Sequence, residues 1–330
     1  MKTFSGKLPG IILAVIIAIP AWFLGKIVPV FGGPIIGFLF GMVLALWKRP
    51  TMFNDGIHYT SKKLLQYSII MLGFDMNLLH VIEAGRQSLY LMIFTLAAVC
   101  LTAYIAGKLL KLDRNTVTLI GVGSAICGGS AIAATAPVIR ANDEEIAQAI
   151  STIFLFNVAA AFVFPILGHA LNMSDYSFAL WAGTAINDTS SVVAAGYAYS
   201  NQAGDLAIIV KLTRTLMIIP ITLILAIYMD KQESTTKKGS FNIVRIFPWF
   251  IIGFIISSMV KTFTAMPADL SSLLAQAGKF IIIMAMAAVG LNTNIVKLTK
   301  SAGKPVLLGL ICWVILSVTS IIVQKMLLHL

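Results

Sequence analysis

The sequence predicts an all-α polytopic membrane protein with about eleven transmembrane segments, and its composition and hydropathy pattern both favour this class. Of its 330 residues, 58% are hydrophobic and 11% are charged, and the mean hydropathy is +0.93. An ordinary soluble domain carries about 25% charged residues. Apolar runs close to the ~20 residues that a bilayer requires recur along the whole chain. The net charge of +11 comes from basic residues in short loops between these runs, so we expect a lipid bilayer and no nucleic acid as partner.

The segments are separated by short polar connections. The first apolar run, 8–24, is followed at once by a second, so we expect a transmembrane helix or signal anchor and not a cleaved signal peptide. Residues 50–63 are predicted to form an interfacial helix or loop, and 230–240 form the longest polar linker. Further spans are expected at 31–47, 64–82, 88–110, 115–139, 145–170, 178–200, 205–229, 243–262, 274–295 and 304–327.

Loop charges predict the orientation of the chain. With a cytoplasmic N-terminus, sixteen Lys and Arg residues lie in cytoplasmic loops and five in outer loops. Because cytoplasmic loops of membrane proteins are enriched in basic residues, we expect the N-terminus inside and the C-terminus outside.

Two short stretches interrupt the apolar pattern and nearly repeat each other. Residues 121–136 read GVGSAICGGSAIAATA, and their echo over 181–196 contains GTAINDTSSVVAAG. Glycine and hydroxyl residues favour an unwound backbone, which a membrane tolerates only where it is buried in protein or lines a cavity. Paired interrupted segments are typical of a transporter's binding site. We therefore expect two discontinuous helices in the core, either broken crossing helices or re-entrant hairpins.

A second echo has a longer period. The sequence IIGF occurs at 35–38 and again at 251–254, and the end of the third span (72–85) resembles that of the tenth (289–302). The offsets agree, and the loop charges orient the matching spans in opposite directions. We therefore predict one integral membrane transporter domain, 1–330, in which about 31–110 is repeated in inverted topology by 247–327.

Charged residues inside these segments indicate the candidate site. Asp188 lies at the unwound centre of the second interrupted segment, and a carboxylate at membrane depth is either functional or the structural partner of a cation. Lys211 and Arg214 are three residues apart on one helical face and could bind an anion, form a salt bridge to Asp188, or extend toward an interface. We expect Asp188 to be their partner in the empty site. The candidate substrate-binding residues are Cys127, Gly128, Gly129, Ser130, Asn187, Asp188, Thr189, Ser190, Lys211 and Arg214.

The motifs ICGGSA (126–131) and AGTAINDTSSVVAAG (182–196), with GLNTN (290–294), resemble the YeiH-type bacterial inner-membrane family, which is labelled as sulfate exporters. The resemblance covers nearly the whole chain. That family is grouped with cation/proton antiporters and bile-acid-type symporters. The resemblance therefore implies a multi-pass protein of the bacterial inner (plasma) membrane, with a panel domain and a core domain that contains two discontinuous helices.

These features predict a secondary transporter, with export the expected direction, for a small inorganic or organic anion such as sulfate or a sulfonate. A proton or sodium ion would be the coupling ion, and a homodimer is one expected assembly. The alternative is a cation/proton antiporter on the same architecture, followed by a passive channel or a membrane enzyme. Neither interrupted segment has the glycine that follows serine in a nucleophile elbow. We therefore expect no catalytic residue, no enzymatic activity, no cofactor and no metal.

Overall fold

Helices make up the regular structure throughout the residues that the computed structural model describes, which are 4–27, 32–47, 49–218, 220–222, 224–225, 248–264, 266–293 and 303–328. Among these residues, five helices are long and apolar enough to cross a membrane: Leu8–Ile27, Leu78–Leu109, Glu144–Ala170, Ala268–Asn292 and Lys304–Met326. Two shorter apolar helices are Gly32–Leu44 and Trp249–Phe263. The polar linker expected at 230–240 lies outside the described residues.

Two predicted boundaries in the first third of the chain were wrong. Helix α3 (Asn54–Tyr59) continues through the π-helical turn η3 (Thr60–Leu64) into α4 (Leu65–Gly73), so 50–63 is no separate element. Helix α5 (Leu78–Leu109) runs through 83–87, where a break was expected, and the break lies at 74–77 instead. The reason is capping, because the Asn77 side chain accepts a hydrogen bond of 2.8 Å from the N–H of Leu79 and so starts α5.

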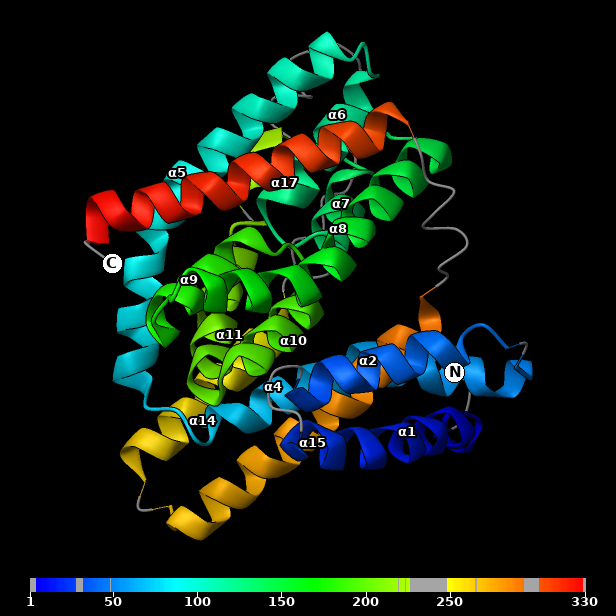
Figure 1. Cartoon of the computed structure of the whole chain (residues 1–330), viewed down its shortest axis with the longest axis vertical. Helices are drawn as coiled ribbons and strands as arrows, with labels where there is room; N and C mark the ends of the chain where they lie inside the picture. Colours follow the sequence, from blue (N-terminus) through cyan, green and yellow to red (C-terminus); the bar gives the residue numbers. More distant parts are fainter. Residues whose placement is uncertain are drawn as a thin grey trace, which may run out of the picture.

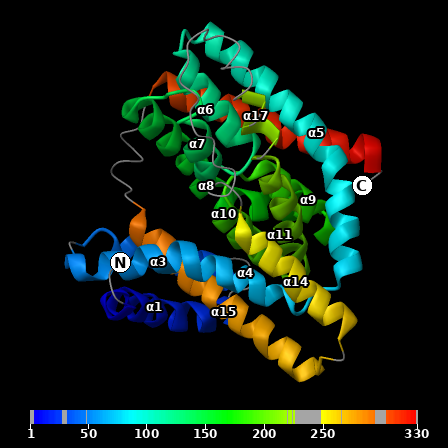
Figure 2. The same cartoon turned by 180° about the vertical axis from the view of Figure 1, so that it is seen from behind.

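The helices form two groups, which Figures 1 and 2 show lying side by side. We call the lower group in Figure 1 the panel: α1 (Leu8–Ile27), α2 (Gly32–Leu44), α3, α4, α14 (Trp249–Phe263) and α15 (Ala268–Asn292). We call the other group the core: α5, α6 (Arg114–Ala125), α7 (Gly129–Thr135), α8 (Asp143–Ala170), α9 (Asp175–Ala185), α10 (Thr189–Tyr199), α11 (Asn201–Leu216) and α17 (Lys304–Val323).

The contact between core and panel is mostly apolar. Each group has its own buried cluster, and a third cluster joins them, in which Val193 and Ala194 of the core share a cluster with Phe38 and Ile282 of the panel. Among the described residues, hydrogen bonds also cross between the groups: the backbone N–H of Leu78 in α5 donates to Thr262 Oγ1 in α14 over 2.8 Å, and Lys279 Nζ in α15 donates to Asn201 Oδ1 in α11 over 3.4 Å. Because dispersion contacts are non-directional, such an interface tolerates small displacements better than one built from many hydrogen bonds.

The second interrupted segment is a hairpin. Asp175 begins α9, and Ser200 directly follows α10, yet Ser200 Oγ donates a hydrogen bond of 2.6 Å to Asp175 Oδ1. The hydroxyl of Tyr199 also donates to the carbonyl oxygen of Met173. Helix α10 therefore returns to the end of the molecule at which α9 begins.

The first interrupted segment is also a hairpin. Asn115, in the first turn of α6, donates through Nδ2 to Glu145 Oε2 over 3.1 Å, and Glu145 belongs to the capping box that starts α8. Between the two helices the chain folds back, because a methyl group built on Gly123 in α6 would lie 3.0 Å from Ile132 in α7. Helix α8, with 28 residues and a length of about 42 Å, then separates the open ends of the two hairpins. Of the two arrangements that the sequence left open, the structure therefore has the hairpins, and they enter from opposite ends of the core.

This geometry predicts which positions share a membrane face. In a variant without native cysteines, Asp113→Cys and Ala141→Cys flank the first hairpin and should react with an impermeant thiol reagent from one face. Leu171→Cys and Gln202→Cys flank the second hairpin and should react from the other face. Labelling of positions 113 and 141 from opposite faces would mean that α6 and α7 together cross the membrane.

Candidate functional site

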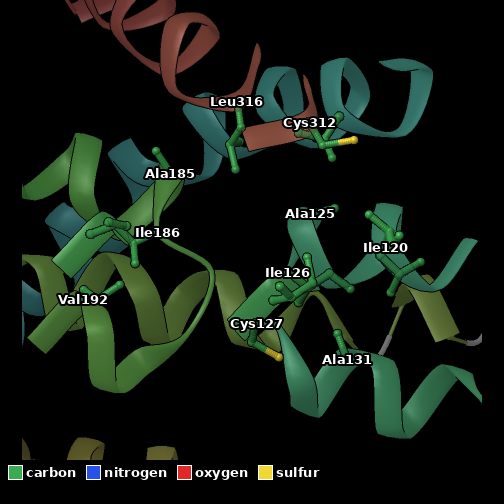
Figure 3. Packing of buried hydrophobic residues seen from close by; sticks show 14 of the residues in the cluster. Ile120, Ala125, Ile126, Cys127, Ala131, Ala185, Ile186, Val192, Cys312 and Leu316 are labelled. Carbon is green, nitrogen blue, oxygen red and sulfur yellow. The ribbon is translucent and has the colours of Figure 1, made fainter. Parts of the chain in front are cut away.

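The tips of the two hairpins meet inside the core. The first tip is the turn between α6 and α7, and the second is the extended link between α9 and α10. A methyl group built on Gly128, at the first tip, would lie 3.8 Å from the carbonyl carbon of Asn187, at the second. Figure 3 shows Ile126 and Cys127 at the first turn and Ile186 at the start of the second link. The two centres that the sequence singled out are thus close together.

Lys211, fully buried in α11, joins the two tips. Its Nζ atom donates two hydrogen bonds, one to the carbonyl oxygen of Ile126 and one to that of Ile186, each 2.9 Å long. Ile126 is the C-cap of α6, and Ile186 is the C-cap of α9. Since the last carbonyls of a helix have no partner within it and carry partial negative charge, an ammonium group suits this position.

Arg214, one turn later in α11 and also fully buried, bonds to the same two helix ends. Its Nε donates to the carbonyl oxygen of Ala125 over 2.8 Å, and Nη2 donates to that of Ser124. On the other hairpin, Nη1 donates to the carbonyl oxygens of Thr184 and Ile186. The planar guanidinium group, with five donors, can satisfy several carbonyls at once where an ammonium group would satisfy fewer.

The expected ion pair between these cations and Asp188 does not appear in the geometry. The Asp188 carboxylate accepts hydrogen bonds from the backbone N–H of Ser190, at 2.9 Å, and from its hydroxyl, so it caps α10. The hydrogen bonds of Lys211 and Arg214 go to backbone carbonyls. The expectation was wrong because it paired formal charges and left out the partial charges at helix ends.

Asn157, in the middle of α8, contributes to the site although the sequence analysis missed it. It is 3% exposed, and its Oδ1 atom accepts hydrogen bonds from the backbone N–H groups of Asn187 (3.2 Å) and Asp188 (3.1 Å). Its signal in the sequence was an amide side chain inside an otherwise apolar stretch, 153–168. Because hydrocarbon offers a polar side chain no hydrogen-bond partner, an amide in such a stretch indicates a polar contact within the protein.

The predicted site residues differ in exposure. Cys127, Gly128, Asn187 and Ser190 are buried, whereas Gly129, Asp188 and Thr189 are half-buried and Ser130 is exposed. Two buried polar atoms at the tips, Ser124 Oγ and Asn187 Oδ1, have no hydrogen-bond partner among the described residues. Each such atom costs about 1–3 kcal/mol, and unsatisfied groups in native proteins often mark functional sites.

The glycine at position 128 is required by the backbone. Its φ angle is +66°, a conformation that side chains rarely adopt, and a methyl group there would also lie 3.3 Å from Ile153. Gly128→Ala should therefore lower the free energy of unfolding in mixed micelles by about 1–3 kcal/mol. The neighbouring Gly129→Ala is the matched control, because a methyl group there meets nothing within 4 Å and helix α7 favours alanine. Equal losses in both variants would contradict the strained turn.

Arg214 should be a major contributor to stability. Arg214→Met removes the donors of three buried carbonyls, those of Ser124, Ala125 and Thr184, while the carbonyl of Ile186 keeps Lys211. Each carbonyl costs about 1–3 kcal/mol when unsatisfied, so we expect a loss of at least about 3 kcal/mol. Arg49→Met is the matched control, since half-buried Arg49 donates to one helix-end carbonyl, that of Leu291, over 2.6 Å. Its loss should be about 1 kcal/mol. Comparable unfolding free energies for the two variants would show that the buried contacts carry no special weight.

Comparison with known proteins identifies the family. Residues 9–309 match the family described as Conserved hypothetical protein 698. A UPF0324 membrane protein of Streptococcus pyogenes serotype M6 is 49% identical, over 98% of each chain. One from Streptococcus agalactiae serotype V is also 49% identical over 98% of each chain. A third, from Fusobacterium nucleatum, is 49% identical over 98% of this chain and 99% of its own. The chain therefore belongs to the UPF0324 membrane protein family, which confirms the resemblance of its motifs to YeiH-type proteins.

Proposed function

We propose that the protein is a secondary transporter of a small anion, such as sulfate or a sulfonate, and that the anion binds where the hairpin tips meet. The observation that carries this proposal is the complete burial of Lys211 and Arg214 at that point. Burying a cation in an apolar interior is unfavourable unless something compensates its charge. A bound anion would compensate this charge, so the arrangement suits a transporter of anions.

The local charge balance supports an anion. Two C-terminal helix ends (α6 and α9) and two N-terminal ends (α7 and α10) lie at the tips, and their half-charges of opposite sign roughly cancel. The side chains then contribute two buried cations, Lys211 and Arg214, and one carboxylate, Asp188, which leaves about one positive charge. A bound anion would neutralise this charge in a medium of low dielectric constant, where electrostatic attraction is strong.

The arrangement of the hairpins supports alternating access. One hairpin enters the core from each end, so a single short hairpin separates the shared site from each membrane face. The packing of the panel is consistent with the inverted repeat that the sequence predicts: α2 packs on α15, while α14, the repeat partner of α2, packs on α4, the repeat partner of α15. In transporters, inverted repeats generate two related states, open to opposite faces.

The rigidity of the core supports movement of the core against the panel. Helix α9 is fixed to α17 by buried polar contacts: Thr184 Oγ1 lies 2.7 Å from Ser320 Oγ, and Trp181 Nε1 donates to the carbonyl oxygen of Ser317 over 3.1 Å. The core–panel contact, in contrast, is mostly apolar. We expect this motion in the inner membrane with the N-terminus in the cytoplasm, the orientation that the loop charges favour.

The second candidate function is a cation/proton antiporter, which half-buried Asp188 favours. The two functions predict opposite effects of Asp188→Asn. This variant keeps an oxygen that can cap α10 and removes one negative charge. It should tighten the binding of an anion, whereas it should abolish the binding of a cation.

The experiment is a thermal-shift screen of the purified protein. Sodium salts of sulfate, sulfite, small sulfonates, carboxylates and chloride are compared at constant ionic strength, and chloride salts of sodium, potassium and choline are compared at several pH values. We expect saturable stabilisation by at least one oxyanion, about 2.7 kcal/mol at one hundred times its dissociation constant, and a larger effect in Asp188→Asn. Stabilisation by a cation alone, lost in Asp188→Asn, would overturn the anion proposal in favour of the antiporter.

A further inference from the structure

Asn157 connects the second hairpin tip to a long, continuous helix. The backbone N–H groups of Asn187 and Asp188 lie in the extended link between α9 and α10, where no helical carbonyl is available to them. Asn157 Oδ1 accepts from both, at 3.2 Å and 3.1 Å. One side-chain oxygen thus fixes two consecutive peptide groups, and with them the direction in which their side chains leave the backbone.

The other half of the same amide faces the first hairpin tip. Asn157 Nδ2 is 3.5 Å from the position of a methyl group built on Gly128. Ile153, one turn earlier in α8, would be 3.3 Å from the same methyl group and 3.1 Å from one built on Gly123. Since residues four apart lie on one helical face, Ile153 and Asn157 together form a support on α8 for both tips.

Asn187, whose backbone Asn157 binds, has a side-chain oxygen without a hydrogen-bond partner among the described residues. Asn187 is 1% exposed, so this oxygen is buried, and the adjacent backbone is held in place by Asn157. A fold selected for stability alone would relax the backbone to pair this atom, because each unsatisfied group is costly. The two hydrogen bonds to Asn157 oppose that relaxation.

We propose that Asn157 is a positioning residue of the transport site, which sets the place of Asn187 and Asp188 relative to Gly128 so that a substrate contacts both hairpin tips. The role of Asn157 in substrate binding rests on the proposed function, whereas its hold on the link between α9 and α10 does not. Asn157 acts through the backbone of the second tip, and Lys211 acts through the helix-end carbonyls next to it.

Two variants of Asn157 test the inference. Asn157→Leu has a similar volume but no acceptor, and Asn157→Asp keeps the acceptor and introduces a carboxylate beside the site. Thr152→Val is the matched control, because Thr152 is a buried polar residue on the same helix that lies next to Gly309 of α17, away from the tips.

The first measurement is hydrogen exchange of the backbone amides of residues 187 and 188 in the purified protein without added anion. Exchange should be about fivefold faster or more in Asn157→Leu, because each amide loses one hydrogen bond worth about 1 kcal/mol, and unchanged in Asn157→Asp and Thr152→Val. Unchanged exchange in Asn157→Leu, or equal acceleration in Thr152→Val, would overturn the inference. If Asn157→Leu does not fold, accelerated exchange in Asn157→Asp would overturn it as well.

The second measurement is the dissociation constant of the oxyanion that stabilises the unmodified protein in the thermal-shift screen. We expect weakening of about tenfold or more in Asn157→Leu, a similar weakening in Asn157→Asp through charge repulsion, and no change in Thr152→Val. Unchanged affinity in either Asn157 variant would mean that the hydrogen bonds from residues 187 and 188 to Asn157 serve the fold alone, and it would overturn the inference. If no anion stabilises the unmodified protein, the proposed function fails, while hydrogen exchange still decides whether Asn157 holds the link.

Discussion

The arrangement of the core depends on how the carbonyl ends of two helices are satisfied in an apolar interior. Helices α6 and α9 both stop inside the protein, where water cannot bond to their last carbonyls. Lys211 and Arg214 supply the missing donors for both ends at once, from adjacent turns of α11. Two hairpins that enter from opposite ends can therefore meet without leaving these carbonyls unsatisfied, and the same contacts place positive charge at their junction.

This solution links stability to the proposed function. The half-charges of four helix ends nearly cancel, so the junction keeps the excess charge of its side chains, which suits an anion. Asn157 of α8 also accepts hydrogen bonds from the second tip, and α9 is hydrogen-bonded to α17, so two further helices of the core support the junction. The apolar contact with the panel leaves that core free of directional constraints over most of their shared surface.

Much of the architecture could be predicted from the sequence, because apolar runs and glycine-rich interruptions have direct physical meaning in a membrane. The echo of 121–136 in the second interrupted segment located both tips. The three-residue spacing of Lys211 and Arg214 inside an apolar span placed both cations on one face of a helix. The choice between crossing helices and hairpins was not accessible, since it depends on contacts such as Ser200 with Asp175. The partners of the cations were missed because backbone carbonyls, present at every residue, leave no trace in a sequence.

The most direct test of this account is an experimental structure of the protein in lipid nanodiscs without added anion, at a resolution that shows side-chain density. The account predicts that Lys211 Nζ lies within hydrogen-bond distance of the carbonyl oxygens of Ile126 and Ile186, both 2.9 Å away here, with the guanidinium of Arg214 between the ends of α6 and α9. Density that pairs either cation with the Asp188 carboxylate, or that separates the two hairpin tips, would contradict it.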